Sequence, residues 1–146
     1  MRDIEEIRRI LPLRFPYLMI DRVIEEEPGR VVALKNVTIG EPFFQGHFPE
    51  PLPAVMPGTL ILEAMAQTAA FLLTRDAGGE GYLIAVDAAR FRRRVTPGDQ
   101  LRLEAVVTRR RASLVQADVV ATVGGERAAS ATISLLARGG EVVEDA

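Results

Sequence analysis

Cysteine is absent from this chain of 146 residues, and histidine occurs only once, at position 47. Without thiols there can be no disulfide framework, no thiolate metal site and no cysteine nucleophile. A metal site built from several histidines is excluded as well. We therefore expect no bound metal, and any chemistry must come from carboxylates, hydroxyls, backbone groups and one imidazole.

The chain also lacks a strong excess of charge and a long uninterrupted apolar run. Its net charge of −2 and its pI near 5.5 argue against a nucleic-acid partner. The longest apolar stretch, residues 60–73, is too short for a membrane span and contains Glu63 and Gln67. The first ten residues are charged throughout and lack the apolar segment of a secretory signal, so we expect a cytoplasmic protein without a membrane partner.

The composition supplies enough apolar residues for one hydrophobic core. Hydrophobic residues make up 48% of the chain and charged residues 26%. At this length, such a balance is typical of one globular domain. We predict a single domain over residues 1–146, with residues 139–146 as a disordered tail.

Hydrophobic periodicity and turn residues predict helices at 3–10 and 59–74, and strands at 18–25, 30–38, 82–95, 101–110, 113–123 and 127–137. Residues 40–58 form a proline-stiffened loop that carries His47. Short connections such as Pro97-Gly98-Asp99 favour antiparallel neighbours. The pattern predicts an α+β fold in which an antiparallel sheet covers one long apolar helix.

Glu63 is out of place in the middle of that apolar helix, because a carboxylate there costs several kcal/mol unless it is solvated, paired or functional. Thr59, Glu63 and Gln67 recur every four residues, so they form one polar stripe along the helix. The stripe could simply face solvent. A solvent-facing stripe would normally carry more charge, and we therefore favour a functional interpretation.

His47 lies just before the same helix, where its imidazole could be held near the helix start. A histidine and a carboxyl in apolar surroundings can act as general base and general acid. Gly58 follows Pro57 at the helix start, where unpaired N–H groups attract developing negative charge. In the plainer alternatives, His47 is a surface residue and Pro57-Gly58 is only a helix-entry turn.

Two arginine runs, Arg92–Arg94 and Arg109–Arg111, end strands that we predict to be neighbours. Most such runs are solvated strand ends. The functional alternative is docking of an acidic or phosphate-bearing partner, since guanidinium groups suit phosphate well.

Several stretches together resemble the 3-hydroxyacyl-[acyl-carrier-protein] dehydratases of type II fatty acid synthesis. The matching segments are Leu11-Pro12-Leu13-Arg14-Phe15-Pro16, Asp21-Arg22-Val23, Lys35-Asn36-Val37-Thr38, Glu41-Pro42-Phe43-Phe44-Gln45-Gly46-His47-Phe48-Pro49, Met56-Pro57-Gly58, Glu63-Ala64-Met65-Ala66-Gln67, Ala89-Arg90-Phe91-Arg92-Arg93-Arg94-Val95 and Pro97-Gly98-Asp99-Gln100-Leu101. They occur in the family's order over nearly the whole chain.

The resemblance implies a hot-dog fold, in which an antiparallel sheet wraps a long central helix. It also implies homodimers, often assembled into trimers of dimers. In such a dimer His47 of one subunit would work with Glu63 of the other. Glu63, where the isomerising relatives typically have Asp, favours the non-isomerising branch.

The implied activity is that of a hydro-lyase that converts (3R)-3-hydroxyacyl groups on acyl carrier protein to trans-2-enoyl groups. His47 would take a proton from C2, the N–H of Gly58 would stabilise the thioester oxygen, and Glu63, oriented by Gln67, would assist loss of the C3 hydroxyl. No cofactor is expected, because the thioester acidifies C2 and the phosphopantetheine arm belongs to the carrier.

The arginines Arg92, Arg93 and Arg94 are the expected docking site for the carrier. Two departures from the family pattern stand out: Leu13 replaces a common histidine, and the loop at residues 50–55 is about two residues longer than usual. Two other functions stay open, an acyl thioesterase of the same fold and a non-catalytic acyl-binding module.

Overall fold

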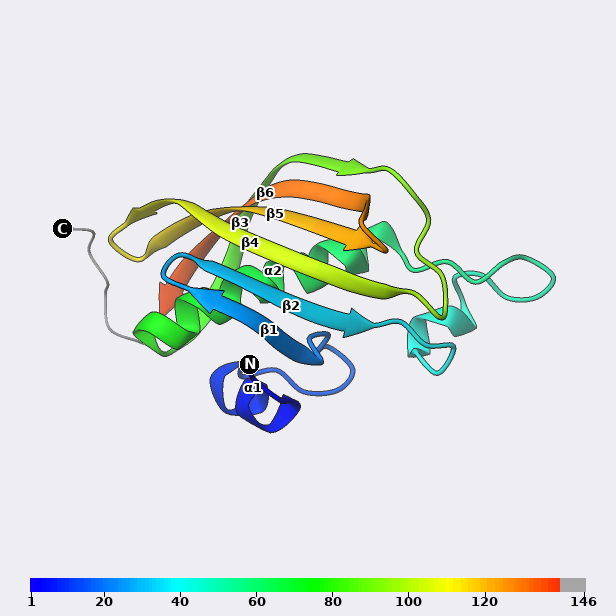
Figure 1. Ribbon diagram of the computed structural model, residues 1–146, viewed down its shortest axis with the longest axis horizontal. Coiled ribbons are helices and arrows are strands. Elements are labelled where there is room, and N and C mark those ends of the chain that lie inside the picture. The colour runs from blue at the N-terminus through cyan, green and yellow to red at the C-terminus, as the bar shows by residue number, and fades with distance from the viewer. Residues whose placement is uncertain (140–146) are drawn as a thin grey trace.

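The computed structural model describes residues 1–139, so the predicted tail lies outside the described residues apart from Gly139. The helices are α1 (Ile4–Ile10), α2 (Gly58–Ala77) and a short 3-10 helix, η1 (Pro42–Gln45). The strands are β1 (Arg22–Glu27), β2 (Arg30–Asn36), β3 (Glu80–Phe91), β4 (Gln100–Arg111), β5 (Leu114–Val123) and β6 (Glu126–Arg138). They form one antiparallel sheet in the order β1-β2-β4-β5-β6-β3 (Figure 1). The predicted α+β fold is confirmed.

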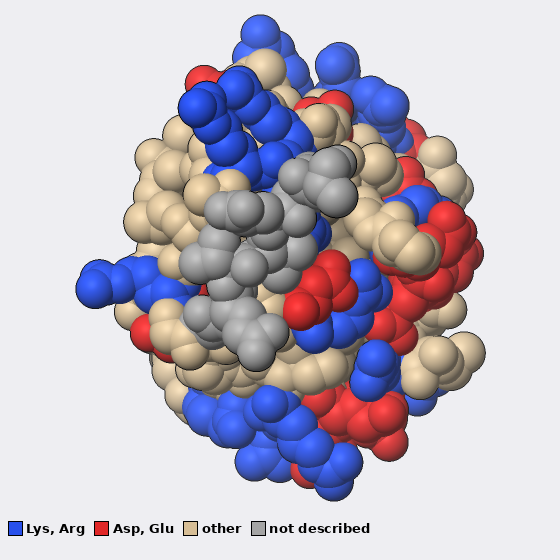
Figure 2. Space-filling view, turned by 90° about the vertical axis from the view of Figure 1, so that its left-hand side faces the viewer, with Lys and Arg blue, Asp and Glu red and all other residues tan. Residues whose placement is uncertain are grey.

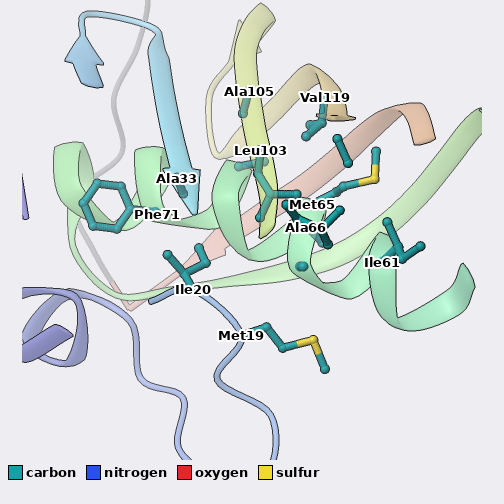
Figure 3. Packing of buried hydrophobic residues seen from close by; sticks show 14 of the residues in the cluster. Met19, Ile20, Ala33, Ile61, Met65, Ala66, Phe71, Leu103, Ala105 and Val119 are labelled. Atoms are coloured by element: carbon teal, nitrogen blue, oxygen red, sulfur yellow. The ribbon is translucent and has the colours of Figure 1, made fainter. Parts of the chain in front are cut away.

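The sheet curves around α2 because this helix is apolar on nearly every side. Twelve of its residues are buried, and Phe71 and Leu72 have no exposed surface. Figure 3 shows Met65 and Phe71 among side chains that come from the strands, such as Leu103 of β4. Burial of side chains of this size stabilises a fold by roughly 1.5–3 kcal/mol each. No helix in residues 1–139 has the length and apolar character needed to cross a membrane.

The strand predicted from residue 18 begins only at Arg22. Met19 and Ile20 are buried in the core, but the N–H of Met19 donates to the side-chain oxygen of Gln67 at 2.8 Å. A helix side chain thus takes the place of a strand partner. The local sequence pattern cannot predict this contact, since the two residues are 48 positions apart.

The two arginine runs lie at opposite ends of the sheet, so the prediction that their strands are neighbours is wrong. In the described sheet β3 pairs with β6, whereas β4 pairs with β2 and β5. Alternating directions along the sheet make β3 and β4 antiparallel, and their C-terminal ends therefore point opposite ways. The cause is α2, which crosses the sheet and delivers β3 to its far edge (Figure 1).

Basic and acidic side chains are interspersed on the face of the molecule shown in Figure 2. Among the acidic residues of the protein, Glu26 of β1 joins two distant segments. It forms ion pairs with Arg2 at 2.9 Å and with Arg75, near the end of α2, at 3.3 Å. Burial raises the pKa of Glu26, but hydrogen bonds and charges from the two arginines outweigh burial and hold the pKa below its usual value. Glu26 therefore favours the folded state when it is ionised.

We expect Glu26→Gln to lower the free energy of unfolding at pH 7 by about 1 kcal/mol. Because the pKa of Glu26 is lower in the folded than in the unfolded chain, its stabilising contribution is complete above about pH 4.3 and is lost as the pH falls through the folded-state pKa. Urea unfolding of both proteins at pH 7 and below pH 4 should show the deficit shrink in acid. Glu50→Gln, on an exposed loop, is the matched control, and a Glu26→Gln deficit independent of pH would contradict this role.

Candidate active site

His47 follows η1 and is held through its backbone and its ring. Its N–H donates to the carbonyl of Phe43 at 3.0 Å, and its carbonyl accepts from the N–H of Val55 at 3.0 Å. The ring atom Nδ1 lies 2.7 Å from the carbonyl oxygen of Val55, and the ring stacks on Phe48 with centroids 4.1 Å apart. The imidazole of this half-buried residue therefore has a defined orientation.

The contact with Val55 determines which ring nitrogen can act as a base. A carbonyl oxygen only accepts hydrogen bonds, so Nδ1 carries the proton and donates it. In the neutral imidazole the other nitrogen, Nε2, is then unprotonated. Nε2 is the atom of His47 that can remove a proton from a substrate.

The loop of residues 48–54 lies between His47 and Val55. It projects away from the body of the molecule (Figure 1), and Leu52 at its tip is 56% exposed. Val55 closes the loop, and both of its backbone groups contact His47. Its N–H donates to the carbonyl of His47, and its carbonyl accepts from the imidazole ring. The outer part of the loop thus projects, while its base is paired with His47.

A cleft of about 450 Å³ lies beside His47 at the start of α2. Its lining residues are His47, Val55, Met56, Gly58, Ile61, Phe91, Arg92, Arg93, Arg94 and Val95. The N–H of Gly58, the first residue of α2, has no acceptor in residues 1–139, as is usual at a helix start. A Cβ at position 58 would lie 3.1 Å from the ring of Phe91. Glycine is therefore what allows Phe91 to pack over the helix start.

Gln67 holds Glu63 from one helical turn away. Its Nε2 donates to Oε1 of Glu63 at 2.9 Å and to the carbonyl of Tyr17 at 2.6 Å, while its own oxygen accepts from the N–H of Met19. Since the N–H of Met19 can only donate, the orientation of the amide is fixed. Gln67 is only 2% exposed. The solvent-facing alternative for the polar stripe is thus wrong at Gln67, although Thr59 at the helix start is exposed.

Glu63 keeps one carboxyl oxygen available. Its Oε1 accepts from Gln67, whereas Oε2 has no hydrogen bond and the carboxyl has no ion pair within residues 1–139. The Glu63 side chain is half-buried, and most of the other residues of α2 are apolar. Such a carboxyl can exchange a proton through its free oxygen.

The two candidate catalytic side chains are not joined within the described chain. His47 and Glu63 share no hydrogen bond across residues 1–139, and Glu63 is not among the residues that line the cleft at His47. The structure brings His47, Gly58 and the arginines together. It places Glu63 in a second group with Gln67 and the segment that contains Tyr17.

The three arginines near the cleft differ in their surroundings. Arg93 is half-buried and pairs with Asp99 at 3.6 Å and with Glu126 at 3.3 Å. Arg92 and Arg94 are exposed and have no ion-pair partner in the described part of the chain. Arg92 and Arg94 are therefore available to an external partner, whereas Arg93 stabilises the turn before β4.

Sequence reasoning missed two residues of this site, Val55 and Phe91. Val55 acts through its backbone carbonyl, so its side chain carries no signal for the role. Phe91 is 50% exposed and adjoins the arginine run. A large aromatic residue next to that run is the one signal that could have indicated its position.

An apolar cavity of about 300 Å³ lies further along α2. Its lining residues are Leu11, Pro12, Leu13, Ala70, Thr74, Glu80, Gly81 and Tyr82. Ala70 and Thr74 follow Glu63 by seven and eleven residues, so they continue the same face of the helix. Leu13 contributes apolar surface to this cavity. The leucines that line it are Leu11 and Leu13.

Comparison with known proteins places the chain among dehydratases. Residues 11–132 match the model of the FabA-like domain family. The "3-hydroxyacyl-[acyl-carrier-protein] dehydratase FabZ" of Oceanobacillus iheyensis is 47% identical over 138 residues, which cover 92% of this chain and 97% of that protein. The protein of the same description from Anaeromyxobacter sp. is 52% identical over 136 residues, with 88% and 86% covered.

Among solved structures, one similar chain comes from the dehydratase heterocomplex ApeI:P of Xenorhabdus doucetiae, with a TM-score of 0.77 at 16% identity over 91% of each chain. This likeness shows the fold alone, and the predicted hot-dog fold is confirmed. The identity to the two relatives extends over nearly the whole length of both partners. The chain therefore belongs to the 3-hydroxyacyl-[acyl-carrier-protein] dehydratase family.

Proposed function

We propose that this chain dehydrates (3R)-3-hydroxyacyl groups carried on acyl carrier protein to trans-2-enoyl groups in fatty acid biosynthesis. Its family assigns the reaction class, which is that of a hydro-lyase. The observation that supports the proposal most directly is the hydrogen bond from Gln67 to Glu63, which orients a carboxyl group on an otherwise apolar helix. Glu rather than Asp at position 63 supports the branch that does not isomerise the product.

In the proposed first step, Nε2 of His47 removes a proton from C2 of the thioester. The Nδ1–H bond to Val55 supports this role, because it leaves Nε2 basic and stabilises the imidazolium that forms. The electrons move toward the thioester oxygen, which the N–H of Gly58 stabilises at the positive end of α2. The thioester itself acidifies C2, so the proposed reaction uses no metal or redox cofactor.

In the proposed second step, Glu63 donates a proton through Oε2 to the C3 hydroxyl, which leaves as water. The C2–C3 double bond forms as the C3–O bond breaks. Gln67 supports this step because it holds Oε1 and so directs the other oxygen. The proton on His47 then passes to Glu63, directly or through water, and both side chains regain their starting states. The acyl chain extends along α2 to the apolar cavity at Ala70.

A second copy of the chain completes the site in this proposal. β3 is an edge strand of twelve residues, and its Tyr82, Leu83 and Ile84 are between 48% and 53% exposed. A long apolar edge readily pairs with another strand. Two β3 edges that pair symmetrically would form a dimer in which His47 of one subunit serves Glu63 of the other.

The opposite edge of the sheet supports a closed dimer rather than an extended sheet. β1 presents Arg22 and Glu25–Glu27, and its three glutamates form ion pairs with Arg30 and Arg75. Charged edge strands resist pairing with other chains. We propose further that three such dimers assemble into a trimer of dimers, as the family resemblance suggests.

Arg92 and Arg94 are the proposed docking residues for the carrier protein. Both are exposed at the mouth of the cleft that holds His47 and Gly58. Arginine binds carboxylate and phosphate groups well, and a pantetheine arm has to enter beside the docked carrier. We also place the reaction in the cytoplasm, because a carrier-bound substrate reaches the enzyme through water.

Two other functions would give different products. In a thioesterase, Glu63 would direct water at the thioester carbonyl and a free thiol would be released. In a non-catalytic module, the acyl chain would bind without turnover. The identity to dehydratases along the chain favours dehydration over both.

With a 3-hydroxyacyl carrier substrate, we expect wild-type protein to form the enoyl thioester without free thiol. His47→Ala and Glu63→Gln should each reduce kcat by at least about 100-fold, since each removes a general acid or base. Enoyl absorbance and a thiol reagent measure the two products, and Glu50→Gln is the unaffected control. Thiol release would instead establish a thioesterase, and acyl binding without either product would establish the binding module.

Mixed dimers test whether the site lies between subunits. Co-expressed His47→Ala and Glu63→Gln chains should recover about a quarter of the wild-type activity, because half of the dimers in a random mixture are mixed and each has one native site. Doubly tagged protein isolates the mixed dimers for assay. If the mixture stays as inactive as either variant alone, His47 and Glu63 act within one chain.

Charge reversal tests the docking residues. We expect Arg92→Glu/Arg94→Glu to raise KM for the carrier-bound substrate at least about tenfold, because like charges now repel the carrier. KM for a small pantetheine thioester should be unchanged. Arg109→Glu/Arg111→Glu, the same charge change at the other end of the sheet, is the control. Equal effects of the two double variants would refute docking at the cleft.

A further inference from the structure

Lys35 is the only charged residue among the buried polar residues of the described chain. It lies in β2, within one of the segments that carry the family resemblance, and only 3% of it is exposed. A buried ammonium group is costly unless it is paired. The proposed reaction makes no use of it, so its burial needs a separate explanation.

The partner of Lys35 is Glu41. The ammonium nitrogen lies 2.7 Å from Oε1 of Glu41, whose side chain is 22% exposed, and 3.5 Å from the carbonyl of Asn36. The short contact to Glu41 is thus the main compensation for the buried charge. Five residues separate the two in the chain, and the pair joins the end of a core strand to the start of an irregular segment.

Glu41 is the residue that begins this segment. It immediately precedes η1, and its carbonyl accepts from the N–H of Phe44 at 3.1 Å. The next link is the carbonyl of Phe43, which accepts from the N–H of His47 at 3.0 Å. A continuous set of hydrogen bonds therefore leads from the buried ammonium group to the backbone of the proposed base.

The other side of His47 depends on Val55, which closes the projecting loop. Residues 48–53 of that loop are exposed and offer no packing against the core. On the side that precedes His47, by contrast, Phe44 is 95% enclosed in the core and Glu41 is tied to β2. η1 is therefore one of two supports for the imidazole. The other is Val55, which precedes the buried Met56, whose N–H bonds to the carbonyl of Val95 at 2.8 Å.

We propose that the Lys35–Glu41 ion pair is a positioning device that sets the place of η1 and, through it, of His47. The inference rests on the proposed role of His47 as the base. Lys35 and Glu41 are positioning residues and touch no substrate. Displacement of a catalytic group by about 1 Å is enough to cost about 100-fold in rate, so a shift of η1 has a measurable consequence.

The decisive variant is Lys35→Met, which keeps the apolar stem of the side chain and removes the buried charge. Glu41 is partly exposed and can be solvated by water, so the variant should fold. We expect kcat to fall between about 10-fold and 100-fold with KM nearly unchanged, since substrate binding is not altered. Glu41→Gln, which keeps an acceptor for Lys35, should show a smaller loss in the same direction.

The imidazole itself supplies a readout independent of activity. Because His47 is the only histidine, its ring signals in an NMR spectrum need no assignment by mutation. Lys35→Met should shift the ring signals and weaken the Nδ1–H signal that reports the bond to Val55. Arg2→Met is the matched control, since it breaks an ion pair of 2.9 Å at a distance from the cleft and should leave kcat and the ring signals unchanged.

Wild-type kcat and unshifted ring signals in folded Lys35→Met would overturn the inference. Equal losses of kcat in Lys35→Met and Arg2→Met would also overturn it, because they would indicate general destabilisation. If the wild-type protein forms no enoyl product, the proposed function fails. The ring signals would still show whether the ion pair positions His47.

Discussion

Enclosure of α2 by one curved sheet is the constraint on which the rest of the structure depends. A helix with twelve buried residues has few directions in which a polar group can find water. Buried polar side chains on it therefore tend to find hydrogen-bond partners inside the protein, and in the described residues only Thr74 Oγ1 has none. Gln67 finds partners with its whole amide, which holds Tyr17, Met19 and Glu63 at once.

The site forms where this enclosure ends. The start of α2 is less enclosed, since Thr59 is exposed, and Gly58 leaves an unpaired N–H beside the cleft. The imidazole of His47 reaches the same place from an irregular segment. This segment is held at two points, by β2 through Lys35 and by the paired base of the loop at Val55.

The two edges of the sheet differ in how readily they can pair with another chain. β1 is charged and its acidic residues are engaged in ion pairs, whereas β3 is long and exposes apolar side chains. This asymmetry favours one symmetric contact between two chains and disfavours further growth of the sheet. It also suits a site whose base and acid are not joined within one chain.

The sequence by itself determined the fold class, the apolar helix, the exceptional position of Glu63 and Gln67, and the family. These features depend on periodicity, on the unusual placement of polar residues and on contiguous motifs, all of which are local. Only the tertiary structure decided that β3 lies at the far edge, that β1 begins after the contact of Met19 with Gln67, and which nitrogen of His47 is basic. The physical reason is that strand order, burial and hydrogen bonds to backbone carbonyls depend on contacts between segments that are separated in the chain. Local sequence patterns cannot predict such contacts.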